Sequence, residues 1–438
     1  MEGHPPRPAL RGPPARALRA LAIALSIPAL FLAIASLPWR PHATSGPPGP
    51  AARKACSGTL AAGAAEARFD LPSGAPIAGF RRNTWASEGT PGPVGARAVV
   101  LEAGGCRFAI ASGELLLVPL PLASQIRARV QDLRLDGLFL GATHTHAGPG
   151  GYWDEPIGEY GGTAPYDATM EARIADGYAQ AIRAAAAALA PARVGERVVD
   201  AGALVRGRSN GDEEARLTLV RLARSDGAPV AELAVLASHP TLLGKANRRI
   251  DGDWPGRFLA DAPHGLRVFL QGALGDQSAE GTGGARPEAP AYGEAVSRAA
   301  DVEVPLGEAG TPVPLAFATV EVPMPDFEPG GLPGFLRPAA RTLLGGHVPR
   351  HAAVTALRVG PVVLAGVPAE PVAAVGARWR ARAGEDVVLV SLVNDYVGYA
   401  ETAEDWAAGR GETKRTVLGP ELAERLGAGV EAAVAAVR

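Results

Sequence analysis

The stretch LFLGATHTHAGPGG, residues 138–151, joins a short apolar run to two histidines and a glycine-rich turn. The apolar residues from Leu138 onward are typical of a buried strand, and the glycines and proline that follow exclude a helix there. Because successive side chains of a strand alternate between its faces, His144 and His146 are expected to point the same way. Such a pair supplies two nitrogen ligands to a metal, or one ligand and one acid–base group; a pair of half-buried strand histidines is the alternative.

Length and charge limit the classes of function. At 438 residues the chain is long enough for a large core. A prior of about 150 residues per domain suggests two or three units, unless one layered α/β fold takes up most of the chain. The 43 lysines and arginines nearly balance the 45 aspartates and glutamates, so the basic excess of a nucleic-acid-binding protein is missing. We expect a small or neutral partner and no nucleic acid.

The N-terminal residues predict export. An apolar run at residues 20–38 is preceded by four basic residues: Arg7, Arg11, Arg16 and Arg19. This pattern indicates a signal peptide or a transmembrane anchor with the N-terminus inside and the remainder outside. A Pro/Gly linker follows, so we expect an export segment with linker at residues 1–50 and a globular unit at residues 51–438. The expected location is extracytoplasmic: secreted, periplasmic, or associated with the membrane through the N-terminal segment.

The chain has two cysteines, Cys56 and Cys106, and both lie in the part expected to be exported. An oxidising compartment permits a disulfide between them, and two buried, unpaired thiols are the alternative. Two cysteines are too few for a zinc site by themselves. We therefore predict a bridge between the first ordered residues and the strand near Cys106.

Hydrophobic patterning predicts a mixture of strands and helices along the globular unit. Strands are expected at residues 98–102, 107–118, 138–145, 193–205, 217–222, 230–238, 267–271, 354–359, 362–367 and 387–392. Helices are expected at residues 122–135 and 166–189, between Glu370 and Arg382, and at the C-terminus. The Pro- and Gly-rich segment 305–349 is predicted to be a long surface loop near the site. The predicted fold class is α/β (α+β), with layered mixed β-sheets flanked by helices in a single large catalytic domain.

Polar side chains recur where apolar strands stop. These residues are His144, His146, His239, Asp276, Ser278, Glu370, Tyr396 and Tyr399. Ligands and catalytic groups of layered α/β folds gather beyond strand ends, so we expect these side chains to converge at one site. Each also has a structural interpretation. His239 could cap a backbone carbonyl, Glu370 could stand in the first turn of a helix, Asp276 could form an Asx turn, and the tyrosines could simply pack.

These motifs, in this order, resemble the catalytic domain of the neutral/alkaline ceramidases, amidohydrolases that cleave the N-acyl amide bond of a sphingoid lipid. The resemblance covers roughly residues 60 to 435. Its matching stretches are residues 62–65, 74–79, 141–151, 208–210, 237–239, 252–253, 271–278, 367–370 and 394–399.

The resemblance implies a zinc site and a set of catalytic residues. Zinc would be held by His144, His239, Glu370 and one of the two tyrosines, Tyr396 or Tyr399, and imidazole and carboxylate ligands suit that ion. The implied catalytic residues are His146, Arg208, Asp276 and Ser278. His146 and Arg208 would face the scissile group, and Ser278 would be a nucleophile or a substrate hydrogen-bonder. The implied reaction is hydrolysis of ceramide, or of a related N-acyl lipid or small amide, to a fatty acid and an amine.

The sequence departs from the family in ways that bear on the substrate. Ser278 is followed by Ala279 and Glu280 where the family has Pro-Asn, and after a terminal helix we expect no C-terminal β-sandwich domain of the kind that full-length relatives carry. Another N-acyl lipid, or a smaller amide or ester, stays open as the substrate.

Two further functions also stay open. One is a different metallohydrolase, such as a phosphoesterase or an esterase, with the loops of Asp253 and Asp276 as its only support. The other is a non-catalytic lipid-binding protein. The presence of His144, His239 and Glu370 together argues against that second alternative.

Overall fold

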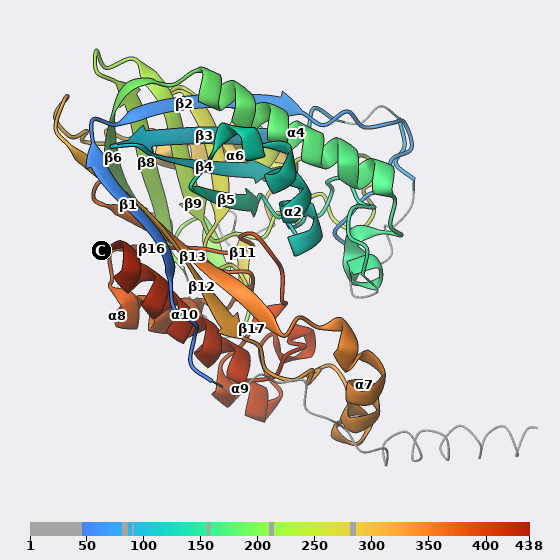
Figure 1. The fold of residues 1–438 in the computed structure, drawn as a ribbon. Helices are drawn as coiled ribbons and strands as arrows, with labels where there is room; N and C mark the ends of the chain where they lie inside the picture. The colour runs from blue at the N-terminus through green and yellow to red at the C-terminus, as the bar shows by residue number, and fades with distance from the viewer. Residues whose placement is uncertain (1–45, 81–85, 90–91, 156–157, 210–213, 281–285) are drawn as a thin grey trace, which may run out of the picture.

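Two large sheets, stacked face to face and covered by helices on their outer sides, make up the computed structural model (Figure 1). The structure describes residues 46–438 except 81–85, 90–91, 156–157, 210–213 and 281–285. The larger sheet has eight strands in the order β10 (Leu266–Gln271), β9 (Pro229–Leu236), β8 (Arg216–Arg224), β6 (Ala190–Asp200), β2 (Ala61–Arg68), β3 (Gly95–Ala103), β4 (Cys106–Gly113) and β5 (Gly137–Ala142).

The smaller sheet has five strands. Their order is β1 (Ala52–Gly58), β12 (Val313–Pro323), β13 (His351–Val359), β14 (Val362–Gly366) and β16 (Val387–Val390). Two short pairs complete the β structure: β7 (Val205–Gly207) with β11 (Gln277–Ala279), and β15 (Glu370–Pro371) with β17 (Tyr399–Ala400).

Helices form the outer layers. Figure 1 shows α4 (Ala168–Ala187) lying along the larger sheet, and α10 (Glu421–Val437) lying along the smaller sheet on the opposite side of the molecule. Within the described ranges, the other α-helices are α2 (Leu120–Arg129), α5 (Asp253–Ala260), α6 (Ala289–Ala300), α7 (Arg337–Leu344), α8 (Ala373–Ala383) and α9 (Ala403–Ala408). The predicted fold class, mixed sheets flanked by helices, is confirmed.

A central core lies between the two sheets. Phe108 and Phe139 of the larger sheet and Phe317 and Leu357 of the smaller sheet are buried in it, and the rings of Phe108 and Phe317 stack 5.5 Å apart. Burying a side chain of this size contributes about 1.5–3 kcal/mol relative to leaving it exposed. The two sheets are therefore one packed unit, and loops from both of them share one edge.

Parallel strand pairs direct the loops to that edge. Although most pairs are antiparallel, β4 pairs with β5, β9 with β10, and β14 with β16 in parallel. The carboxyl ends of parallel strands meet at one edge of a sheet. The Ser112 hydroxyl donates to the carbonyl of Phe269 (2.6 Å), and the amide of Ser391 donates to the carbonyl of Gln271 (2.8 Å). These bonds bring the loops after β5, β9, β10 and β16 together.

A disulfide joins Cys56 of β1 to Cys106 of β4, with Cα atoms 5.9 Å apart. Because these strands belong to different sheets, the bond crosses the central core. Closing a loop of 50 residues destabilises the unfolded chain by about 4 kcal/mol. The predicted bridge is confirmed, and the alternative of two unpaired thiols is wrong.

The prediction of a long loop at residues 305–349 is wrong. This segment contains β12, which pairs with β1 on one side and with β13 on the other, and it also contains α7. Pro314 and Pro323 suggested a loop, but they lie at the two ends of β12, where a missing N–H costs few sheet hydrogen bonds. The alternating apolar residues between them form the buried strand.

Several predicted boundaries also differ from the structure. The strand expected at 107–118 ends at Gly113. The strand expected at 138–145 ends at Ala142, and the helix expected at 122–135 ends at Arg129 and continues as a short 3-10 turn. The strand expected at 193–205 is divided into β6 and β7. Most of the predicted export segment lies outside the described residues. No helix within the described ranges has the length and apolar character needed to cross a membrane.

Candidate metal centre

Four loops beyond strand ends bring the candidate ligands together. His144 follows β5, His239 follows β9, and Glu370 begins β15 after the end of β14. Glu370 pairs in parallel register with Tyr399 of β17, which follows β16. The predicted convergence of strand-end residues is therefore found in the structure.

The backbone at His144 differs from the strand geometry that the sequence suggested. His144 has a φ of 66°, in the left-handed region, and stands two residues beyond the end of β5. A non-glycine residue in a sparsely populated backbone region costs about 1–3 kcal/mol and persists only where its surroundings enforce it. His144 and His146 do face one site, but a turn, and not strand alternation, brings them there.

The ligand atoms lie within a few ångströms of one another. The Nε2 atom of His144 is 3.4 Å from Oε2 of Glu370, and Nε2 of His239 is 3.2 Å from the same oxygen. The Nε2 atom of His146 is 3.4 Å from that of His144. One ring nitrogen from each of the three histidines lies within 4.8 Å of the others. His144, His239 and Glu370 are each only 2% exposed.

Backbone carbonyls determine which ring nitrogens carry protons. Nδ1 of His144 lies 2.7 Å from the carbonyl oxygen of Leu116, and Nδ1 of His239 lies 2.9 Å from that of Gln277. A carbonyl oxygen only accepts hydrogen bonds, so both Nδ1 atoms are the donors in the assigned tautomers. Each Nε2 of the neutral ring then presents a lone pair toward Glu370. This orientation by a second hydrogen bond is the usual arrangement of metal-binding histidines.

The donor set fits a metal cation. Oε2 of Glu370 is buried and accepts no hydrogen bond, although two imidazole nitrogens lie within 3.4 Å of it. Lone pairs that face one another at this distance repel, and a bound cation converts that repulsion into attraction. Two imidazole nitrogens and one carboxylate oxygen are the donors that Zn²⁺ accepts in catalytic sites.

Burial and neighbouring charges set the protonation states. Burial, with Arg208 nearby, lowers the pKa of His239 to about 4, so that imidazole is neutral at pH 7. Burial and the two other histidines lower the pKa of His146 well below its usual value. Burial raises the pKa of the Glu370 carboxyl, but His144 and His239 outweigh it and hold that pKa well below its usual range. The site therefore combines the neutral imidazoles of His146 and His239 with an ionised carboxylate.

Both candidate tyrosines border the cluster. The hydroxyl of Tyr396 donates to Oε1 of Glu370 (2.7 Å), and that of Tyr399 lies 3.2 Å from Nε2 of His239. Burial, followed by the charge of Glu370, raises the pKa of both phenols well above their usual value, so they are neutral. The ring of Trp153 packs edge-on against Tyr396, with centroids 6.0 Å apart.

Glycine is required where the chain passes His146. Gly79 has a φ of +117°, and a Cβ atom there would lie 2.3 Å from Cα of His146. Its amide donates to the carbonyl of Gly162 (2.8 Å), while the ring of Phe80 packs 4.9 Å from the imidazole of His146. The loop that contains Gly79 therefore holds His146 against the other two histidines.

Comparison of the structure with solved structures identifies the fold. The crystal structure of neutral ceramidase from Pseudomonas aeruginosa matches with a TM-score of 0.73 over 86% of this chain and 74% of that one, at 19% sequence identity. The chain has the neutral ceramidase fold. A structure of a ceramidase complexed with C2 matches with a TM-score of 0.70 over 86% of this chain and 75% of that one, also at 19% identity.

Sequence comparison agrees with the fold. The neutral ceramidase of Mycobacterium tuberculosis is 29% identical over 212 residues, which cover 40% of this chain and 32% of that protein. The match thus spans about a third of the length of that relative. No family model matches the chain. The predicted resemblance to neutral ceramidases is confirmed.

Three of the residues with predicted catalytic roles lie near the candidate metal centre. Ser278 of β11 forms an isolated parallel bridge with His239, which places it beside that ligand. The guanidinium of Arg208 pairs with Glu412 (3.1 Å), and its Nη2 also donates to the carbonyl of Gly275. The carboxylate of Asp276 accepts from the backbone amide of Ala373 (2.9 Å) at the start of α8, close to Glu370. These contacts position Asp276 as a support for the Glu370 segment, and the catalytic roles stay predictions.

The candidate metal centre opens into a cavity of about 800 Å³. His144, His146 and Glu370 form part of its wall. Its apolar lining residues are Leu116, Leu117, Leu120, Pro121, Trp153, Val348, Pro349, Val397, Val417 and Leu418. Sequence patterns did not single out Trp153, Lys414 or Arg415, which also line it, because isolated aromatic and charged residues in loops resemble ordinary surface.

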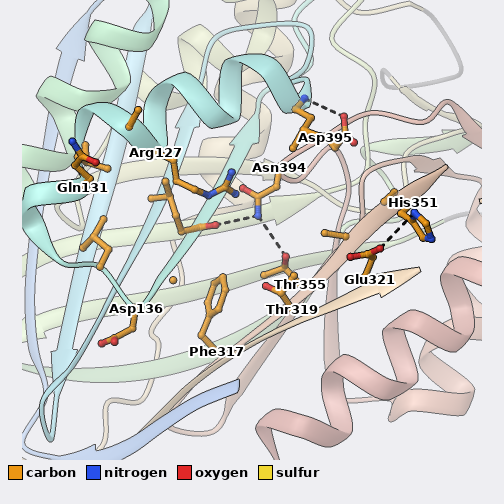
Figure 2. A pocket seen from close by; sticks show the side chains of 18 residues that line it. Arg127, Gln131, Asp136, Phe317, Thr319, Glu321, His351, Thr355, Asn394 and Asp395 are labelled. Atoms are coloured by element: carbon orange, nitrogen blue, oxygen red, sulfur yellow. Dashed lines mark hydrogen bonds and ion pairs between the residues drawn. The ribbon is translucent and has the colours of Figure 1, made fainter. Parts of the chain in front are cut away.

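A second cavity, of about 850 Å³, lies between α2 and strands β12 and β13 (Figure 2). Asn394 stands in its wall with a φ of 63°, donates to the carbonyl of Leu138 (3.0 Å) and accepts from the amide of Leu140 (3.1 Å). Asp395 accepts from the amides of Leu120 (3.0 Å) and Tyr396 (2.8 Å). These bonds anchor the segment before Tyr396 to β5 and to the start of α2, and Tyr396 itself reaches the candidate metal centre.

Proposed function

We propose that the chain is a zinc-dependent amidohydrolase that cleaves the N-acyl amide bond of ceramide or of a related N-acyl lipid, releasing a fatty acid and an amine. The observation that carries this proposal is the convergence of two imidazole lone pairs on an ionised, otherwise unbonded Glu370 oxygen, at the wall of a largely apolar cavity. The neutral ceramidase fold and the similarity to a curated neutral ceramidase support it.

His144, His239 and Glu370 would hold the zinc, with His146 and the two tyrosines at its border. Zinc held there would supply a hydroxide at neutral pH and a Lewis acid for the amide carbonyl. The apolar wall, which includes Leu116 and Trp153, binds the acyl chain and excludes water from it.

The residues around the ligands have separate tasks in this reaction. Tyr396 holds Oε1 of Glu370 and so orients the other carboxylate oxygen toward the histidines. His146 is neutral, because burial lowers its pKa, and in this proposal it accepts a proton from water and returns it to the departing nitrogen. Arg208 adds positive charge behind His239, on the side of the Gly275 loop.

Metal analysis of the purified chain tests the site. We expect about one zinc per chain, as three protein ligands and an open position would hold. His144→Ala and His239→Ala should each lose both the zinc and the release of fatty acid from N-acyl lipids. His264→Ala is the matched control, because His264 pairs with Asp301 away from the site. Full zinc content in both ligand variants would refute the metal centre. Release of phosphate from a phosphoester substrate, without release of fatty acid from N-acyl lipids, would favour a phosphoesterase.

We also propose that the catalytic unit acts outside the cytoplasm and reaches membrane lipid through its N-terminal segment. The arginine-flanked apolar run at residues 20–38 and the disulfide between Cys56 and Cys106 support this location. A reporter that is active only after export, fused after Arg438, should be active. A silent export reporter beside an active cytoplasmic reporter at the same position would refute the proposal.

A further inference from the structure

Two cations line the same cavity as the candidate metal ligands. Lys414 and Arg415 belong to the short turn Thr413–Arg415 that follows α9, and both side chains are exposed to the cavity. The guanidinium carbon of Arg415 lies 5.9 Å from the ring centroid of Tyr399, and the hydroxyl of Tyr399 is 3.2 Å from Nε2 of His239. The cationic part of the wall therefore begins one side chain away from the metal ligands.

The charge on this wall is only partly compensated. Glu412, whose side chain is 4% exposed, pairs with both Arg208 and Arg415, so one carboxylate faces two guanidinium groups. Among the residues that the structure describes, no carboxylate pairs with Lys414. Together these four side chains carry an excess of positive charge beside the cavity.

The acidic groups that line the cavity do not offset this excess. Glu370 is part of the metal cluster, and the Asp395 carboxylate already accepts two backbone amides. Glu155 lies 3.8 Å from Nδ1 of His347, on a different segment of the wall. A negative charge on a bound molecule would thus meet Lys414 with no paired carboxylate among the described residues, and Arg415 beside a Glu412 carboxylate that is shared with Arg208.

We propose that the site takes N-acyl compounds whose amine portion carries a carboxylate or a sulfonate within one or two carbons of the amide nitrogen, as in N-acyl amino acids. The anion binds Lys414 and Arg415, while the acyl chain occupies the apolar wall. The short span between Arg415 and the metal ligands, bridged by Tyr399, matches an anion close to the scissile nitrogen. This inference rests on the proposed amidohydrolase function and names its substrate class.

The reaction balances without any further reactant. The oxygen of water bonds to the acyl carbon, and the bond between that carbon and the nitrogen breaks. Both protons of the water end on the nitrogen, so that the products at neutral pH are a fatty carboxylate and a free amino acid in its ammonium form. The headgroup anion is unchanged throughout and serves only for binding.

Matched substrates test the proposal with the zinc-loaded full chain. N-lauroylglycine and N-lauroyltaurine carry the anion, and N-lauroylethanolamine is a neutral analogue with the same acyl chain. We expect kcat/KM for the two anionic amides to exceed that for the neutral amide by about 10-fold or more, mainly through a lower KM, because a charge-assisted contact discriminates by that order.

Substitution of the unpaired cation isolates the cause. Lys414→Gln should lower kcat/KM for N-lauroylglycine about 10-fold more than for N-lauroylethanolamine, and Lys414→Arg should restore the preference. Only three lysines occur in the chain, and the exposed Lys245, which does not line this cavity, provides the matched control Lys245→Gln. Arg415 is less suitable for this test, because its loss would also release Glu412.

The possible outcomes separate the inference from the function on which it rests. Cleavage of all three amides at similar kcat/KM, or a Lys414→Gln loss equal for charged and neutral substrates, overturns the anion site and leaves the amidohydrolase intact. An equal loss that appears only on vesicles containing anionic lipid also overturns it, because Lys414 would then bind the membrane surface. Failure to cleave any N-acyl amide in the zinc-loaded state overturns both.

Discussion

The molecule has two cavities of similar volume, about 800 Å³ at the candidate metal centre and about 850 Å³ between α2 and the smaller sheet, and they share Leu120 and Asp395 as lining residues. In the first, an ionised Glu370 oxygen accepts no hydrogen bond and faces unprotonated ring nitrogens. In the second, the side chains of Asn394 and Asp395 bond to the backbone, and Glu321 pairs with His351. The volume of a cavity does not distinguish a candidate functional site from a gap between layers. Buried ligand atoms that converge without hydrogen-bond partners do distinguish it.

The second cavity nonetheless has a structural connection to the first. Asn394, in its wall, bonds to the backbone of β5, and the next residue bonds to the amide of Tyr396. Tyr396 in turn donates to Glu370. The polar groups of the second cavity therefore act as supports for the segment that reaches the candidate metal ligands.

The largest difference between the two cavities is expected when one glutamate in each is changed. Glu370→Gln keeps the shape of the side chain but removes the anionic ligand, so we expect loss of zinc and a fall in turnover of about 10³-fold or more. Glu321→Gln in the second cavity alters only an exposed pair with His351 and should leave turnover within about 2-fold. Metal content and fatty acid release measured on both variants check this. Equal losses in the two variants would contradict the contrast.

A smaller loss of turnover is expected from Ser278 and Arg208, which lie near His239 but outside the proposed set of metal ligands. Ser278→Ala and Arg208→Ala should lower turnover by about 10²-fold with zinc and fold retained, if these groups stabilise the transition state. The control is Arg206→Ala, because Arg206 is the register partner of Ser278 but pairs with Glu280. Kinetics on an N-acyl lipid, with metal content measured in parallel, separate binding from chemistry. Near-normal kcat in both variants would mean that these residues only complete the turn.

Sequence reasoning predicted the members of the ligand cluster but not the reason for their convergence. Apolar runs that stop at His239 and just before His144 have one physical cause, a buried strand reaching the edge of the sheet, and that signal is local. The protonation of each ring depends on the carbonyls of Leu116 and Gln277, which lie 28 and 38 positions away in the chain. Such contacts follow from tertiary packing, which no local pattern encodes.

Two other features were beyond the reach of local patterns for different reasons. Strand β12 was missed because the prolines at its ends outweighed the alternation of apolar residues between them. Its place between β1 and β13 also depends on pairing with β1, whose residues lie more than 200 positions away in the chain. Glu412, Lys414 and Arg415 resemble a solvated charged loop in the sequence. Only the fold shows that this loop closes the cavity beside Tyr399.

The smallest effect is expected from Arg127, which Figure 2 shows on α2 reaching toward Asn394 in the second cavity. Among the described residues no carboxylate pairs with its guanidinium, and Asn394 already bonds to the backbone of Leu138 and Leu140. Arg127→Gln should therefore change the free energy of unfolding by no more than about 0.5 kcal/mol and turnover by less than about 2-fold. The control is Arg129→Gln on the same helix, α2, which removes a surface pair with Asp176 of α4. Denaturant unfolding and kcat measured on both variants check this expectation. A selective loss of turnover in Arg127→Gln, with stability unchanged, would show that the second cavity controls the Tyr396 segment and is more than a structural support.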